Sequence, residues 1–230
     1  MGSVNVDLTT RTDFYRFGKL GPISANSIIG NDFGTFLLKS TLLGPVANQT
    51  GWILENEAAI FSSNIEQLKR IPALEGSKFT FAHFMPPHPT YLFDRDGNIY
   101  DIDPGGGDTD MELYIEQLIW VNKSMEIVVD HILNKAKDRS VIVILGDHGS
   151  DFLRLGNNPY RFQERSGILV AIHLPDSCDR SSLYPTITPV NILRLVFDSC
   201  LGTEFGLLED KSFWTSPKKL DFTPLQDKFR

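Results

Sequence analysis

The sequence predicts an α/β fold in which a mostly parallel sheet is flanked by helices, and three observations predict it. Residues 141–145 and 167–174 are apolar on both faces and rich in β-branched side chains, as buried parallel strands are. Residues 78–85 alternate and include several aromatic side chains, which indicates a third strand. A long helical pattern over 111–137 joins the strand at 78–85 to the strand at 141–145. Such a βαβ unit crosses over right-handed and places its two strands parallel in one sheet.

The size and composition favour one large domain or two small ones with a substantial core. The chain has 230 residues, of which 41% are hydrophobic and 22% charged, and its formal charge is −7. That balance is typical of globular chains. The lack of a basic stretch argues against a nucleic-acid partner, because phosphate neutralisation requires clustered Lys and Arg. No apolar run approaches the roughly 20 residues of a membrane span, and no secretion signal is visible, so we expect a soluble chain.

The first half of the chain is expected to contain an irregular segment, a helix and a strand. Residues 1–50 are rich in Gly, Asn, Ser and Thr, so we expect an irregular amino-terminal segment with one or two short helices, packed on the main domain. Residues 52–70 place apolar side chains on one broad helical face, and Pro72 ends that helix. The strand at 78–85 stops at Pro86, because proline lacks the N–H that a sheet requires.

The second half is expected to alternate helices and strands. After a loop over 94–110, apolar side chains repeat at steps of four and three residues through 111–137 and form one continuous stripe. The strand at 167–174 is followed by a helix over 189–199, which has Pro189 in its first turn.

The two cysteines, Cys178 and Cys200, are too few for a disulfide scaffold. We expect two unrelated thiols, with a single bridge between them as the alternative.

The strongest candidate for chemistry follows the predicted strand at 141–145. Asp147 and His148 supply a carboxylate oxygen and an imidazole nitrogen side by side, which suits Zn²⁺ or a similar divalent ion. The flanking Gly146 and Gly149 let the backbone turn so that neighbouring side chains converge. Ligand sites of α/β sheets lie at the carboxyl ends of strands, which favours a site over an ordinary glycine-bounded turn with a capping Asp.

The remaining histidines are weaker candidates. His88 lies between prolines that hold its imidazole outward, where it can ligate a metal or donate a hydrogen bond to an anionic substrate oxygen. The alternative for His88 is a surface loop histidine. His83 is expected to pack under the site or to ligate only weakly, whereas His131 and His173 are expected to be structural.

Four segments in this order resemble the alkaline phosphatase/sulfatase superfamily. They are KFTFAHFMPPHPTYLFDRDGN at 78–98, YIEQLIWVNKSMEIVVDHIL at 114–133, VIVILGDHG at 141–149 and TPVNILRLVFDS at 188–199. The branch that looks most similar contains the lipoteichoic acid synthases and phosphoethanolamine transferases. The resemblance covers roughly residues 30–200.

The resemblance implies a partial alkaline phosphatase-like fold and a metal-dependent enzyme that acts on phosphate or sulfate esters. Asp147 and His148 would ligate a divalent ion (Zn, Mn, Mg or Ca), and His88 would contact the phosphoryl or sulfuryl oxygens of an anionic substrate. Residues 51–205 would form the sulfatase-like domain, followed by a carboxyl-terminal tail at 206–230. Members of this family generally work outside the cytoplasm, often behind membrane helices.

The chain departs from the family pattern in its first half. Family members begin with a strand that carries an acidic metal ligand, followed by a Thr, Ser or Cys nucleophile, and neither is identifiable here. The chain therefore resembles the carboxyl-terminal half of such an enzyme, with little or no turnover expected from it alone. Two alternatives remain. One is a non-catalytic protein that keeps the fold to bind a partner chain or to self-associate. The other is a small metallohydrolase that uses His83, His88, Asp147 and His148 around one metal.

Overall fold

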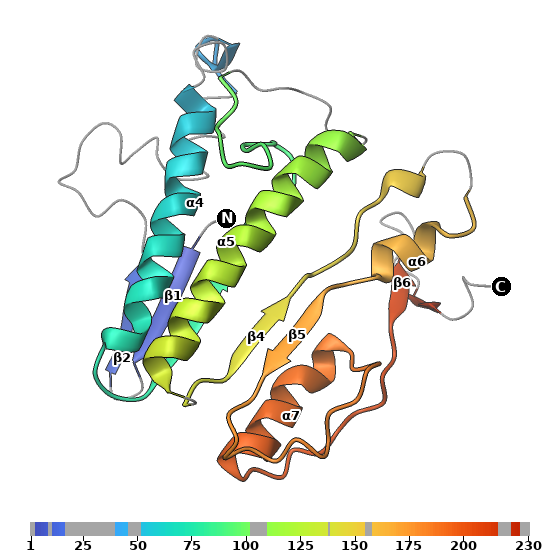
Figure 1. Ribbon diagram of the computed structural model, residues 1–230. Coiled ribbons are helices and arrows are strands. Elements are labelled where there is room, and N and C mark those ends of the chain that lie inside the picture. Colours follow the sequence, from blue (N-terminus) through green and yellow to red (C-terminus); the bar gives the residue numbers. More distant parts are fainter. Residues whose placement is uncertain are drawn as a thin grey trace. The chain divides into compact units, whose positions relative to one another are not determined.

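The structure is a computed structural model that divides the chain into two compact units, Met1–Lys135 and Ala136–Arg230 (Figure 1). The residues that the structure describes are 3–8, 11–16, 40–45, 52–101, 110–137, 139–154, 158–215 and 222–225. Among these residues, no helix combines the length and the apolar character needed to cross a membrane.

The first unit combines two long helices with a three-stranded sheet. Helix α4 spans Trp52–Arg70 and helix α5 spans Met111–Ala136. The sheet has the order β2-β1-β3, formed by β2 (Arg11–Arg16), β1 (Ser3–Leu8) and β3 (Lys78–His83). Both pairings are antiparallel, and the register places Ser3 opposite His83 on β3. A short 3₁₀ helix, η1 (Ile71–Ala73), follows α4 where Pro72 ends it.

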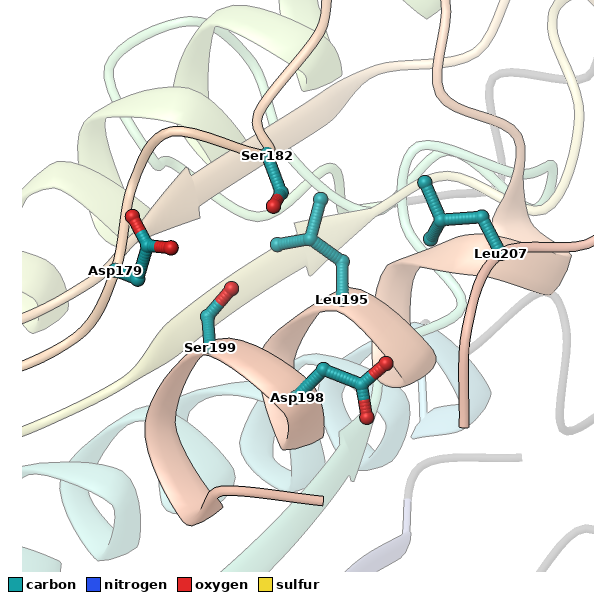
Figure 2. Close-up of a pocket in the computed structure, with 6 residues that line it drawn as sticks. All are labelled: Asp179, Ser182, Leu195, Asp198, Ser199 and Leu207. Carbon is teal, nitrogen blue, oxygen red and sulfur yellow. The ribbon is translucent and has the colours of Figure 1, made fainter. Parts of the chain in front are cut away.

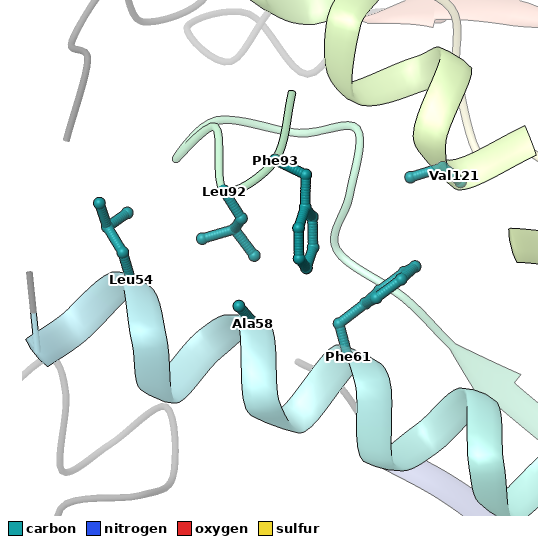
Figure 3. Packing of buried hydrophobic residues seen from close by; sticks show 6 residues of the cluster. All are labelled: Leu54, Ala58, Phe61, Leu92, Phe93 and Val121. Carbon is teal, nitrogen blue, oxygen red and sulfur yellow. The ribbon is translucent and has the colours of Figure 1, made fainter. Parts of the chain in front are cut away.

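The core of the first unit lies between the two helices and the segment that follows β3. Apolar side chains of α4 recur at steps of four and three residues, so they share one face. Figure 3 shows Leu92 and Phe93 lying against this face, with Val121 of α5 on the other side. The buried cluster consists of Leu54, Ala58, Phe61, Leu92, Phe93 and Val121. The ring centroids of Phe61 and Phe93 are 5.3 Å apart, a separation at which aromatic pairs attract each other.

The second unit is built on a two-stranded antiparallel sheet. Strand β4 (Ile142–Leu145) pairs with β5 (Val170–His173), and Ile142 lies opposite His173. Helix α7 (Pro189–Leu201) packs on this sheet through Leu195 and Val196, which share a cluster with Val143 and Ile172. The other elements are η3 (Phe152–Arg154), α6 (Arg161–Ser166) and the antiparallel pair β6 (Phe213–Thr215) and β7 (Phe222–Pro224).

The structure contradicts the predicted mostly parallel sheet, and with it the partial alkaline phosphatase-like fold. Every strand pairing among the described residues is antiparallel. Strands β3 and β4, which should have been neighbours across α5, lie in separate sheets. The error arises because an apolar, β-branched run favours a strand without specifying its partner. Strand β4 pairs with β5, since the chain between them turns back through α6 and returns in the opposite direction.

The individual elements were predicted more accurately than their pairing. The helices expected at 52–70, 111–137 and 189–199 are confirmed within one or two residues. The strand expected at 78–85 is β3, and its side chains alternate between half-buried and exposed, as the alternating sequence requires. Residues 3–16 were expected to be irregular and instead contain β1 and β2.

The expectation of two unrelated thiols is wrong, because Cys178 and Cys200 form a disulfide with a Cα–Cα distance of 4.5 Å. The turn after β5 brings Cys178 against the last turn of α7. A hydrogen bond of 3.0 Å from the backbone N–H of Asp179 to the carbonyl of Ser199 fixes the same approach. Spacing in the sequence could not reveal this proximity, since it depends on how α7 packs on the sheet.

Asp210 ties the segment after α7 to the start of that helix. Its carboxylate accepts hydrogen bonds from the Tyr184 hydroxyl at 2.7 Å, from the Thr188 backbone N–H at 2.9 Å and from the Asn191 amide at 3.1 Å. The Thr188 hydroxyl donates to it as well. The bonds from Thr188 and Tyr184 lower the pKa of Asp210 to about 2. A carboxylate beside the first turn also suits the positive end of the α7 dipole.

This network predicts an acid-sensitive contribution to stability. Because the pKa of Asp210 falls from 3.8 when unfolded to about 2 when folded, its contribution is complete above pH 3.8 and disappears as the pH falls toward 2. We expect Asp210→Asn to lower the free energy of unfolding at neutral pH. The deficit relative to wild type should shrink as the pH falls from about 4 to about 2. Urea denaturation across that range measures it, with the exposed Glu209→Gln as the control. Equal stabilities at neutral pH would contradict the prediction.

Candidate functional site

The Gly146-Asp147-His148-Gly149 segment continues directly from the end of β4. The Gly146 N–H donates to the Leu169 carbonyl at 3.0 Å, so pairing with the β5 side persists one residue beyond the strand. The chain then leaves the sheet and presents two polar side chains to solvent. The Asp147 side chain is 85% exposed and that of His148 is 40% exposed. The site residues expected at the end of this strand are therefore accessible to an ion or a small anion.

The side chains of Asp147 and His148 face each other in a defined orientation. One carboxylate oxygen, Asp147 Oδ1, accepts the His148 backbone N–H at 3.0 Å. The other, Oδ2, lies 3.5 Å from His148 Nε2. The second ring nitrogen, Nδ1, lies 2.9 Å from the Gly149 carbonyl oxygen. A carbonyl oxygen accepts but cannot donate, so Nδ1 carries the hydrogen of this bond.

This tautomer leaves Nε2 of the neutral imidazole with a lone pair that faces a carboxylate oxygen. A cation, either a proton or a metal ion, can lie between two electron-pair donors at this separation. The 3.5 Å separation is short enough for both atoms to ligate a single divalent ion. A histidine ligand whose other nitrogen donates to a backbone carbonyl is also the usual arrangement at metal centres. The pair therefore fits two adjacent ligands of one divalent ion.

Two ligands do not complete a coordination sphere. Across the described parts of the chain, no group of three or more His, Cys, Asp and Glu side chains is placed to hold a metal ion. His83 and His88 belong to the first unit, whereas Asp147 and His148 belong to the second. His83 is the last residue of β3 and is exposed. A tetrahedral zinc site needs two ligands besides Asp147 and His148, from water, substrate or other protein groups.

His88 is exposed, but its backbone is hydrogen-bonded to a residue that lies in the core of the first unit. Its N–H donates to the Met85 carbonyl at 2.9 Å, and its carbonyl accepts the side-chain amide of Gln117 at 3.3 Å. Gln117 lies on α5, is fully buried and also accepts the Leu92 N–H at 2.6 Å. The ring nitrogen Nδ1 of His88 contacts the Pro89 carbonyl. The imidazole is thus exposed at the surface, on a backbone that Met85 and Gln117 hold in place.

Sequence reasoning missed the residues that hold the Asp147–His148 segment in place. Side-chain hydrogen bonds from α6 hold the loop that follows His148, and they involve Arg161, Glu164 and Arg165. Residues 150–166 were assigned no element, because α6 is too short to show a clear apolar stripe. The sequence did contain one indication of this helix. Glu164 and Arg165 follow Arg161 by three and four residues, a spacing that places all three side chains on one side of a helix.

A separate cavity of about 170 Å³ lies beside α7 in the second unit. Its lining residues are Asp179, Ser182, Leu195, Asp198, Ser199 and Leu207 (Figure 2). Both carboxylates are already engaged, since Asp179 accepts from Ser181, and Asp198 accepts from Thr203, Phe205 and Gly206. These bonds lower the pKa of each carboxyl group. The cavity contains none of the predicted site residues.

No protein-family model matches the chain, and neither does any curated protein or solved structure. The functional hypothesis therefore depends on the motifs in the sequence and on the geometry described above.

Proposed function

We propose that Asp147 and His148 form part of a divalent-metal centre that acts on phosphate or sulfate esters, as a hydrolase or transferase. The single observation that supports it most is the Nε2 lone pair of His148 facing Asp147 Oδ2 at 3.5 Å, with Nδ1 held by the Gly149 carbonyl. The imidazole ligand favours Zn²⁺ over Mn²⁺, Ca²⁺ and Mg²⁺, which take mainly oxygen ligands. The resemblance of the motifs supports the ester substrate.

The negative charge of the chain explains why the proposed centre would need a bound metal ion. The chain carries a net charge of −7, so an anionic ester requires a bound cation to approach an exposed carboxylate. A bound metal ion would polarise the ester oxygen and stabilise charge that develops on it. The nucleophile and the remaining metal ligands would come from groups other than Asp147 and His148.

Metal binding tests the proposal most directly. We expect the wild-type chain to bind Zn²⁺ after zinc supplementation, and Asp147→Ala to weaken that binding at least about tenfold, because half of the ligand pair is lost. Calorimetric titration and metal analysis measure both proteins. The control is Asp176→Ala, which removes another exposed carboxylate from the second unit. Wild-type protein that stays metal-free would overturn the proposal and favour the non-catalytic alternative.

The substrate class needs a separate measurement on the metal-loaded chain. Inorganic phosphate and inorganic sulfate are the probes, each titrated with and without Zn²⁺. Binding of either anion that requires the metal supports ester chemistry, and the tighter anion indicates which ester class the site prefers. Metal-loaded protein that binds neither anion would refute the ester assignment while leaving the metal site intact.

A further inference from the structure

The loop after His148 is attached to α6 through reciprocal backbone and side-chain contacts. The Gly149 N–H donates to the Arg165 carbonyl at 2.8 Å. In return, Nη1 of the Arg165 guanidinium donates to the Gly149 carbonyl at 3.0 Å. Gly149 is therefore fixed at both its donor and its acceptor by a single residue of the helix.

Glu164 fixes the next residues of the same loop. Its Oε1 accepts the Ser150 hydroxyl at 2.7 Å and the Phe152 N–H at 2.9 Å, and its Oε2 accepts the Leu153 N–H at 2.8 Å. Hydrogen bonds to a carboxylate are shorter and stronger than those between neutral groups. One side chain thus satisfies three donors of a loop that has no sheet partner.

Arg161 adds a third connection and links α6 to β6. Its guanidinium donates to both carboxylate oxygens of Asp151, at 2.9 and 3.1 Å. The same guanidinium lies 5.6 Å from the ring centroid of Trp214, within the range of a cation–π interaction. Phe162 packs edge-on against that ring, with centroids 4.8 Å apart.

The Gly149 carbonyl connects this framework to the candidate ligands. It accepts from Arg165 Nη1 and lies 2.9 Å from His148 Nδ1, so both lone pairs of one oxygen are occupied. We propose that Arg165, supported by Glu164, is a positioning residue that orients His148 through the Gly149 carbonyl and so keeps Nε2 directed at Asp147. This inference rests on the proposed metal centre for its function, although the positioning itself exists without metal.

The inference predicts a defined effect of Arg165→Met. Without the guanidinium, the Gly149 carbonyl is free to rotate away and His148 loses the acceptor that selects its tautomer. In the metal-free chain, ¹⁵N NMR should show His148 as the Nδ1–H tautomer in wild type and as a mixture in Arg165→Met. Co²⁺ affinity should fall roughly tenfold or more, as for other residues behind metal ligands, with a changed visible spectrum. Arg165→Lys, which retains a cationic donor, should restore most of both signals.

The matched control is Arg180→Met. Arg180 also donates to a backbone carbonyl, that of Leu174, and it forms an ion pair with Asp176. Arg180→Met therefore also removes a guanidinium that is hydrogen-bonded to a backbone carbonyl, but at another place in the second unit. The control should leave the His148 tautomer and the Co²⁺ spectrum unchanged. If Arg165→Met keeps the wild-type tautomer, the positioning inference is overturned. If the tautomer changes as expected but wild type binds no Co²⁺, the inference stands and the proposed metal function fails.

Discussion

Gly149→Ala is expected to lower the free energy of unfolding by about 3 kcal/mol or more, because α6 leaves no room for a side chain at this position. A Cβ atom on Gly149 would lie 2.0 Å from the Glu164 carbonyl oxygen and 2.7 Å from that of Gly167. Both obstacles are backbone atoms, so no change of rotamer relieves the clash. The loop must separate from α6, which breaks the reciprocal bonds between Gly149 and Arg165.

The same motif supplies the control for this substitution. A Cβ on Gly146 would find its nearest neighbour, the Leu169 backbone nitrogen, at 3.6 Å, an ordinary van der Waals distance. Gly146→Ala should therefore remain close to wild type in urea denaturation, while Gly149→Ala unfolds at a clearly lower urea concentration. If the two variants are equally stable, the packing of the loop against α6 is not as described.

Loss of the Cys178–Cys200 disulfide is expected to lower the free energy of unfolding by about 3 kcal/mol. The bond closes a sequence separation of 22 residues, and a crosslink of that span restricts the unfolded chain by about this amount. The effect should appear in wild-type protein when a reducing agent is added before denaturation. It should appear equally in the double variant Cys178→Ala/Cys200→Ala without reductant, since alanine leaves no buried hydroxyl.

The double variant is also the control for the reductant. The chain has two cysteines and both take part in this bond, so dithiothreitol should not change the stability of the variant. Wild-type protein with the same stability in both redox conditions would show that the bond contributes nothing. If the prediction holds, the second unit is more stable under oxidising than under reducing conditions.

The helices could be predicted from the sequence because their information is local. The stripe through α5 and the apolar face of α4 come from the helical repeat itself, whatever the helices pack against. The sheets could not be predicted in the same way. The apolar run of β4 specifies a strand, but its antiparallel partner β5 depends on the path through α6. The disulfide likewise depends on tertiary packing of α7.

The same distinction between local information and tertiary packing applies to the candidate site. The position of Asp147 and His148 just after a strand follows from the glycine-bounded motif, and the structure places them there. Their orientation does not follow from the motif, because it depends on Glu164 and Arg165 of a six-residue helix. The candidate ligands could thus be located from the sequence, whereas the groups that hold their loop could be identified only in the folded chain.

The contacts of Trp214 have a practical consequence for any shortened version of this protein. Trp214 is the middle residue of β6 and contacts both Arg161 and Phe162, so it supports the outer side of α6. The candidate metal ligands lie more than sixty residues earlier in the sequence. A truncation that retained every residue of the glycine-bounded motif but ended before Trp214 would remove the support of the helix that orients that motif.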